Sequence, residues 1–179
     1  NLIEIPDGMD ASLAALTEPA ATATHAVNLA ERSLARPISE TRALVIGGGS
    51  VGLFAALTLA HRGVKDLTLA DTNGLRRQSA EKTGIANVIN PIDAPAADAA
   101  FDLVVDAVGG KATRQASVAA VMPGGVVMHI GLMDNDGGMD VRRMTLQEIT
   151  FIGTYTYTPL DLRATLAQLH EGALGSLDW

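Results

Sequence analysis

A glycine-rich stretch between two apolar segments constrains the fold of this chain more than any other feature. Leu44–Ile46 is a short apolar run of the kind found in buried strands, and the segment Gly47–Gly52 follows it directly. A helical pattern extends from there to about Arg62, and Leu67–Ala70 is predicted to be a second strand. A strand, a glycine turn, a helix and a second strand of this total length make up one β-α-β unit.

Gly47, Gly49 and Gly52 stand where a dinucleotide-binding turn of the form G-x-G-x-x-G needs glycine. The first permits a tight exit from the strand, the second lets a pyrophosphate approach the backbone, and the third lets the helix pack against the strand. The helix that begins near Ser50 and Val51 directs N–H groups and the positive end of its dipole toward this turn, which favours an anion. Since the chain has 18 glycines, the motif gains its weight from the strand before it and the helix after it.

Asp71 follows the second predicted strand and decides which cofactor is expected. A carboxylate about 20 residues beyond the last motif glycine can accept hydrogen bonds from the ribose hydroxyls of NAD. Its negative charge repels the 2′-phosphate of NADP, so we predict NAD(H) over NADP(H). The alternative is that Asp71 only opens a polar turn, Asp71–Gly74, as aspartate often does.

Composition excludes several classes of partner. The chain has 179 residues, enough for one domain with a substantial core, and 47% of them are apolar whereas only 3% are aromatic. The net charge of −7 argues against nucleic acid and anionic membranes as partners. Cysteine is absent, which excludes disulfides and thiolate metal ligands within this chain and fits a cytoplasmic location. No stretch reaches the roughly 18 to 20 apolar residues that span a bilayer.

Strand-like and helix-like segments alternate along the rest of the chain. Further strands are predicted at Ala86–Ile89, Phe101–Val108, Val126–Ile130 and Ile149–Thr154. This alternation implies a parallel sheet with right-handed crossovers. We therefore predict an α/β Rossmann fold, a doubly wound, six-stranded parallel sheet of order 3-2-1-4-5-6 with helices on both faces.

Apolar spacing and stop signals predict the remaining helices. The segment Ala11–Ser33 is expected to be mainly helical and to break at Pro19. Other helices are expected at Gly74–Lys82, at Lys111–Val121, and from Thr158 to about His170. The loop from Leu132 to about Asp140 is predicted to be the most mobile part of the chain.

The predicted strand order also places the ligand site. A dinucleotide lies across the carboxyl ends of the strands where the order reverses, between the first and fourth strands. Besides the glycine turn and Asp71, the cofactor-binding groups expected there are Val108 and Gly109, within Asp106–Gly110, and Ile130, Gly131 and Leu132 after the fifth strand.

The four histidines are scattered without the spacing of metal ligands. A metal site made by this chain alone is therefore not expected. His129, in the buried fifth strand, is interpreted as a hydrogen-bonded core residue.

Several segments spread over almost the whole chain follow one another in an order typical of a single protein family. These segments are Leu16–Pro19, His25–Ala26, Val45–Leu53, Asp71, Arg76–Gly84, Ala86–Pro91, Phe101–Gly109 and Gly124–Leu132. Together they resemble the medium-chain dehydrogenase/reductase family. The resemblance is to the cofactor domain of zinc-dependent alcohol and polyol dehydrogenases, such as the sorbitol- and threonine-dehydrogenase types.

The resemblance implies how the protein is organised. Residues 1–179 are expected to be an NAD-binding Rossmann domain, with residues 1–36 as a helical lead-in from an absent N-terminal GroES-like catalytic domain. The C-terminal return to the catalytic part is expected to be absent as well. Zinc is expected in the full-length protein, held mainly by the absent domain. Family members pair near the sixth strand, so a homo-oligomer, dimer or tetramer, is expected.

The resemblance also implies roles for individual residues. Glu18, in a Glu-Pro pair typical of the polyol branch, would place its carboxylate beside the catalytic zinc, whereas the alternative is a first-turn glutamate favoured by the helix dipole. Arg76 would approach the adenosine ribose and Thr22 the nicotinamide, and the carbonyl at Ile130 would receive the carboxamide. Thr156–Tyr157 stands where polyol enzymes often have Arg-Tyr, which argues against a sorbitol-like substrate.

The predicted function is that of an oxidoreductase domain. The full-length protein would pass hydride between NAD and a small-molecule secondary alcohol or polyol, whereas this chain alone would be inactive. The alternatives are a zinc-free, quinone-reductase-like member of the family, a non-catalytic NAD-sensing Rossmann module, and a methyltransferase domain. Asp71 and Glu18 argue against the quinone-reductase alternative, because those enzymes usually use NADPH.

Overall fold

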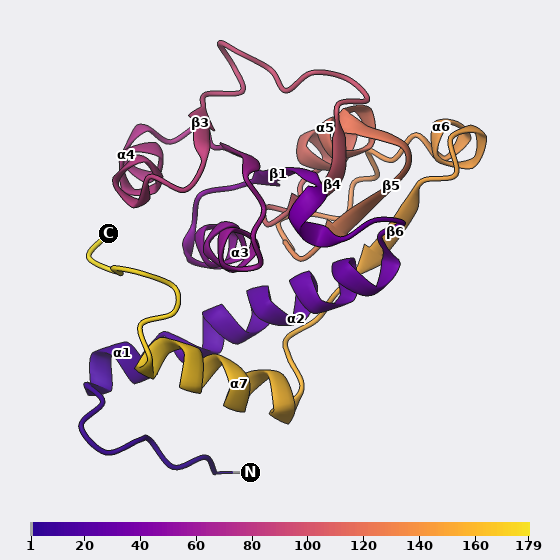
Figure 1. The fold of residues 1–179 in the computed structure, drawn as a ribbon. Coiled ribbons are helices and arrows are strands. Elements are labelled where there is room, and N and C mark those ends of the chain that lie inside the picture. Colours follow the sequence, from indigo (N-terminus) through magenta and orange to yellow (C-terminus); the bar gives the residue numbers. More distant parts are fainter. Residues whose placement is uncertain (1) are drawn as a thin grey trace.

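The computed structural model describes residues 2–179 and contains a six-stranded, fully parallel sheet (Figure 1). The strand order is β3-β2-β1-β4-β5-β6. The strands are β1 (Arg42–Ile46), β2 (Asp66–Ala70), β3 (Asn87–Ile89), β4 (Phe101–Asp106), β5 (Val121–His129) and β6 (Thr150–Gly153). The predicted α/β Rossmann class and strand order are confirmed.

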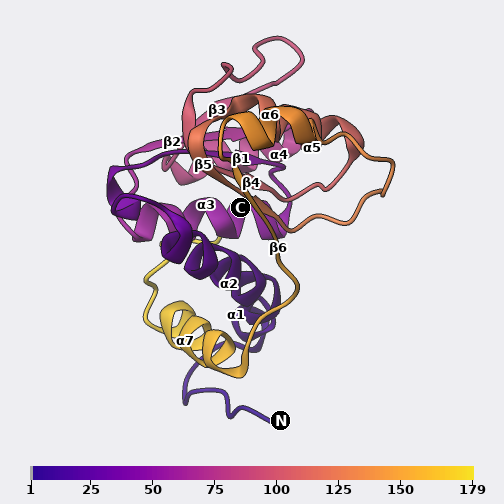
Figure 2. The same cartoon turned by 90° about the vertical axis from the view of Figure 1, so that its right-hand side faces the viewer.

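Helices cover both faces of this sheet. They are α1 (Ala11–Ala15), α2 (Thr17–Ser33), α3 (Ser50–His61), α4 (Gly74–Thr83), α5 (Lys111–Ala120), α6 (Val141–Leu146) and α7 (Pro159–His170), with a 3₁₀ turn η1 at Ile38–Glu40. Figure 2 shows the sheet between α2 and α3 on one face and α5 and α6 on the other, with α7 outside α2. None of the helices within residues 2–179 is long and apolar enough to cross a bilayer.

Alternate residues of the central strands divide the core into two clusters. Ala43 and Val45 of β1 pack in the cluster that includes α2 and α3, whereas Leu44 and Ile46 pack in the cluster that includes Val118 of α5. Both sets are buried, because a parallel sheet with helices on both faces has no solvent-facing side at its centre. The continuous apolar run that predicted β1 reflects this burial.

In the turn from β1 to α3, the backbone at Gly52 comes into direct contact with the backbone at Gly47. A Cβ atom added at Gly52 would lie 1.8 Å from the Gly47 carbonyl oxygen and 3.2 Å from the Ala107 Cβ atom. Gly47 itself has a positive φ of 102°, which favours glycine. The packing role predicted for Gly52 is therefore present in the structure.

The N-terminal helical segment breaks three residues earlier than predicted. The interruption lies at Leu16, between α1 and α2, whereas Pro19 lies inside the first turn of α2. Proline has no N–H to donate to the carbonyl four residues before it, and its ring collides with that carbonyl. The effect of Pro19 therefore falls on Ala15, the last residue of α1.

Two other element boundaries differ from the prediction. Val121, predicted to end a helix, is the first residue of β5 because it pairs with Phe101 of β4, and the register then shifts before the pairing resumes at Val126. Helix α6 was not predicted, because six residues are too few to display a helical period. Its first turn is capped by the Asp140 carboxylate, which accepts from the Arg143 N–H at 2.9 Å.

The connection from β3 to β4 has no helix of its own. Residues 90–100 form turns and an irregular segment that arches over the sheet (Figure 1). Pro91, Pro95 and Ala96 of this segment, Ile46 of β1 and Ala116 of α5 help to line a mainly apolar cavity of about 330 Å³. Crossovers between parallel strands usually carry a helix, so this face of the sheet is covered less completely than the other.

Helix α7 begins where predicted and is attached to α2 by a buried carboxylate. The Asp161 carboxylate accepts from the Thr158 N–H at 2.9 Å and from the Asn28 side-chain amide at 2.9 Å, and His25 Nδ1 lies 2.8 Å away. Burial alone would raise the pKa of Asp161, but the hydrogen bonds from Thr158, Asn28 and His25 outweigh it and hold the pKa below its ordinary value. The carboxylate therefore stays charged near neutral pH.

Replacing Gly52 with alanine tests the contact between α3 and β1. We expect Gly52→Ala to lower the free energy of unfolding by about 3 kcal/mol, because the new methyl group overlaps backbone that cannot move aside. Gly153→Ala is the matched control, since a Cβ atom there meets nothing within 4 Å. Urea denaturation of both variants measures the difference, and equal stabilities would contradict the proposed contact.

Acid titration tests the attachment of α7 to α2. A carboxyl whose pKa is lower in the folded state stabilises that state above its unfolded pKa, near 3.8 for Asp161, and the stabilisation is lost as pH falls through the folded value. We therefore expect the unfolding free energy to drop below about pH 4, and to drop less in Asp161→Asn. Asp66→Asn, at the exposed start of β2, should keep the unaltered profile. An Asp161→Asn profile that matches the unaltered chain would contradict this attachment.

Candidate functional site at the carboxyl ends of β1 and β4

The glycine turn lies at the carboxyl end of β1 and leads into α3. Gly49 is the N-cap residue of α3, so no capping side chain occupies the N–H groups of the first turn. A Cβ atom added at Gly49 would meet only guanidinium atoms of Arg76, at 3.9 and 4.0 Å, so the space over the turn is otherwise open. Ser50 and Val51 form the start of the helix, where N–H groups and the helix dipole favour an anion.

Asp71 is buried beside this turn and connects it to the start of α4. Its Oδ2 accepts from the Gly48 N–H at 2.7 Å and its Oδ1 accepts from the Asn73 N–H at 2.7 Å. Arg76 Nη1 lies 3.7 Å from Oδ2, and its side chain is 57% exposed. The polar turn Asp71–Gly74 that was considered as an alternative is therefore present. The same carboxylate also binds the glycine turn through the Gly48 N–H.

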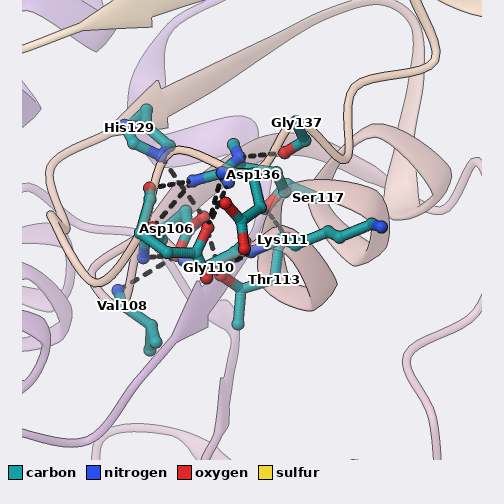
Figure 3. A network of polar contacts seen from close by, with 12 residues as sticks. Asp106, Val108, Gly110, Lys111, Thr113, Ser117, His129, Asp136 and Gly137 are labelled. Carbon is teal, nitrogen blue, oxygen red and sulfur yellow. Dashed lines mark hydrogen bonds and ion pairs between the residues drawn. The ribbon is translucent and has the colours of Figure 1, made fainter.

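Asp106 plays a similar part at the end of β4. Its side chain is fully buried; Oδ1 accepts from the N–H groups of Val108 and Gly109 at 3.0 and 2.8 Å, and Oδ2 accepts from the Thr113 hydroxyl at 3.0 Å (Figure 3). Gly109 has a positive φ of 71°. The carboxylate thus folds the chain back at the end of the strand and joins it to the first turn of α5.

The structure corrects the interpretation of His129. Within the described part of the chain its buried Nε2 has no hydrogen-bond partner, and it lies 3.8 Å from Asp106 Oδ2. The ring packs against Phe151 of β6, with 5.4 Å between the ring centroids. His129 is therefore a partly buried residue that packs against Phe151 and keeps Nε2 within ion-pair distance of Asp106, without a described hydrogen bond.

The segment after β5 runs alongside the turn after β4. The N–H groups of Ile130 and Gly131 donate to the Asp106 carbonyl at 2.9 and 3.1 Å. A Cβ atom at Gly109 would lie 1.9 Å from the Gly131 carbonyl oxygen, so the two backbones touch. Leu132 follows with an exposed side chain. The predicted groups at Val108, Gly109, Ile130, Gly131 and Leu132 are therefore brought together.

Glu18 and Thr22 belong to a different part of the structure. Both lie in the first two turns of α2, where the Thr22 hydroxyl donates to the Glu18 carbonyl at 3.3 Å and the Glu18 side chain is exposed. No hydrogen bond described within residues 2–179 joins either residue to the glycine turn or to Asp106. Their predicted roles near the nicotinamide and zinc remain predictions.

Sequence reasoning missed two side chains of the site, those of Thr113 and Arg114, and the bond that the Gly48 N–H of the predicted turn donates to Asp71. Thr113 binds Asp106. Arg114 is buried in α5 and donates to carbonyls on both sides of the site. A signal for Arg114 was present in its spacing of four residues from Val118, which places a charged residue on the apolar face of a helix.

Comparison with known proteins places these features in a family. Residues 50–171 match the model of the zinc-binding dehydrogenases. The chain belongs to the zinc-binding dehydrogenase family. The predicted resemblance to zinc-dependent medium-chain alcohol and polyol dehydrogenases is thereby confirmed.

Relatives of this zinc-binding dehydrogenase chain include reductases and dehydrogenases. It is 28% identical to the probable diacetyl reductase 2 ((R)-acetoin forming) of Saccharomyces cerevisiae, over 96% of this chain and 43% of that protein. It is 25% identical to the L-threonine 3-dehydrogenase of Streptomyces avermitilis, over 93% of this chain and 49% of that protein. The structure of acetophenone reductase from Geotrichum candidum in complex with NAD matches with a TM-score of 0.87 and 27% identity, over 97% of this chain and 50% of that one. The chain therefore spans about half the length of these relatives.

The family name raises the question of zinc. Among residues 2–179, no group of three or more His, Cys, Asp or Glu side chains could hold a metal ion. Zinc sites in proteins use three or four such ligands, so the described part of this zinc-binding dehydrogenase does not fit a complete zinc site of its own. Glu18 can supply one exposed carboxylate at most.

Proposed function

We propose that this chain is the NAD(H)-binding domain of a zinc-containing alcohol or polyol dehydrogenase. The proposal is carried by one juxtaposition: α3 begins directly after Gly49, and Asp71 Oδ2 lies 2.7 Å from the adjacent Gly48 N–H. A helix N-terminus suits the pyrophosphate of a dinucleotide, and a neighbouring carboxylate suits the ribose hydroxyls. The NAD complex of the acetophenone reductase, a structural relative, supports the same cofactor.

Each part of the site has a task in binding. The N–H groups of Gly49, Ser50 and Val51 would hold the pyrophosphate, and Asp71 with Arg76 would face the adenosine ribose. NAD, when bound, supplies the acceptor or donor of hydride. The backbone groups at Val108 and Ile130 would orient the nicotinamide end, because these segments meet at the carboxyl ends of β4 and β5. The chain's contribution is therefore positioning.

The cavity under the β3–β4 connection is suited to the adenine ring. It has a volume of about 330 Å³, and its lining includes Thr72, next to Asp71, and Thr113, at the start of α5. Apolar walls from Ile46 and Ala70 suit a flat heterocycle, since burial of its faces is favourable. We include the part of this cavity next to Thr72 in the proposed dinucleotide site.

We further propose that residues 1–179 serve as the cofactor domain of a longer protein, with residues 1–36 leading in from a GroES-like catalytic domain. The coverage of about half of each relative and the incomplete ligand set for zinc support this organisation. A small-molecule alcohol or polyol is the expected substrate of that protein, and the cytoplasm is its expected location. Strand β6 lies at the edge of the sheet, where a second copy could pair with it in a dimer or tetramer.

Cofactor titration tests the proposed function. We expect the chain to bind NADH at least about tenfold more tightly than NADPH, because the Asp71 charge opposes a 2′-phosphate. Asp71→Ser removes that charge and leaves the exposed guanidinium of Arg76 beside the ribose site. We therefore expect this variant to bind NADPH about tenfold more tightly than the unaltered chain does.

Arg76→Met in the Asp71→Ser background is the matched control and should abolish the gain in NADPH affinity. Fluorescence of the reduced nicotinamide measures the affinity of each of these three proteins for NADH and for NADPH. Absence of NADH binding by the unaltered chain would refute the proposed function. A preference for NADPH would refute the assignment of Asp71 alone.

Glu18 can be tested in the longer protein. If its carboxylate lies beside zinc, Glu18→Gln should lower zinc affinity or turnover by about 10- to 100-fold, as for other residues that support a metal site. Zinc content by elemental analysis and kcat measure the two effects. Glu171→Gln, at the exposed end of α7, should change neither. Unchanged zinc content and kcat in Glu18→Gln would refute the role beside zinc and favour the alternative, a glutamate that only stabilises the first turn of its helix.

A further inference from the structure

Arg114 is a buried charge whose donors bind three backbone carbonyls and one carboxylate. The residue is 5% exposed and lies in the first half of α5. Nη1 donates to the Gly109 carbonyl at 2.7 Å and to the Asp134 carbonyl at 2.9 Å, Nη2 donates to Asp134 Oδ1 at 2.6 Å, and Nε donates to the Gly137 carbonyl. Desolvation of a guanidinium is costly, so these bonds are needed to keep it buried.

These bonds add side-chain contacts between two segments that backbone hydrogen bonds already join. The N–H groups of Met133 and Asp134 donate to the carbonyls of Val108 and Gly109, both at 3.2 Å, which is long for such bonds. Arg114 adds bonds to Gly109 on one side and to residues 134 and 137 on the other. It therefore closes the loop after β5 onto the turn after β4.

The same loop also returns to the start of α5. The Lys111 N–H donates to Asp134 Oδ2 at 3.1 Å, and a Cβ atom added at Gly138 would lie 2.3 Å from the Lys111 carbonyl oxygen. Figure 3 shows Lys111 and Gly137 in this network with Asp106. The bond from Arg114, with those from the N–H groups of Asp136 and Lys111, holds the pKa of Asp134 below its usual value. The Asp134 carboxylate thus stays charged across the neutral range.

We propose that Arg114 is a positioning residue that fixes the backbone of Ile130–Leu132 against Val108–Gly109 and so sets the binding position of the nicotinamide half of a dinucleotide. This inference rests on the proposed function. The described hydrogen bonds of the Arg114 side chain go to residues 109, 134 and 137, whereas the adenosine half relies on Asp71 and the glycine turn. Loss of Arg114 should therefore weaken one half of the site and spare the other.

The two halves can be separated with two ligands. NADH contains both halves, whereas ADP-ribose lacks the nicotinamide. We expect Arg114→Met to weaken NADH binding about tenfold and to leave ADP-ribose binding within about twofold of the unaltered chain. The NADH affinity of Arg114→Lys should lie between those of Arg114→Met and the unaltered chain, because an ammonium keeps the charge but lacks the planar fork. Arg142→Met, on the exposed side of α6, is the control and should change neither affinity.

Hydrogen exchange provides a readout that does not depend on the ligand. Amides of residues 131–138 should exchange faster in Arg114→Met, while those of β1 and β2 should not. If Arg114→Met folds poorly, Asp134→Asn removes the charged partner and should produce the same changes to a smaller extent.

The possible outcomes separate this inference from the proposed function. An unchanged ratio of NADH to ADP-ribose affinity in Arg114→Met, with NADH bound by the unaltered chain, would overturn the positioning role. Unchanged exchange of residues 131–138 would overturn it as well. Failure of the unaltered chain to bind either ligand would refute the proposed function, and with it any positioning of a dinucleotide. Faster exchange of residues 131–138 in Arg114→Met would then show only that Arg114 holds the loop in place.

Discussion

The contact between the first turn of α3 and the end of β1 is the constraint on which the site depends. With hydrogen alone at Gly52, the helix backbone meets the Gly47 carbonyl region directly, and a methyl group there would overlap it. This approach fixes the N-terminus of α3 above the end of β1. Gly49 and the Gly48 N–H belong to the turn between these two elements, and the Asp71 carboxylate at the end of β2 accepts from that N–H.

Two buried carboxylates stabilise the ends of neighbouring strands by the same means. Asp71 accepts from Gly48 and Asn73, and Asp106 accepts from Val108 and Gly109. The N–H groups at a strand end have no ladder partner, so carboxylate and backbone satisfy one another. The turns of the site are therefore held by short charge-assisted hydrogen bonds to buried carboxylates, and Arg114 adds a bond to the Gly109 carbonyl.

The position of the loop after β5 depends on contacts that its composition does not reveal. Its Gly, Asp and Asn residues predict the most mobile part of the chain, at residues 132–140. In the folded chain the Arg114 side chain bonds to Asp134 and Gly137, and Gly138 packs against Lys111. Turn-forming residues allow this loop to bend sharply, but a partner about 20 residues away along the chain determines where it lies.

The sequence by itself determined the parts that rest on local sterics and periodicity. These include the strand, glycine turn and helix from Leu44 to Arg62, the position of Asp71, the start of α7 at Pro159, and the sheet order that follows from alternating elements. Only the tertiary structure decided that Val121 begins a strand, that Asp106 binds Thr113 and that Arg114 closes the loop. Those features depend on hydrogen-bond partners that the fold brings together, and neither periodicity nor propensity at a residue specifies such a partner.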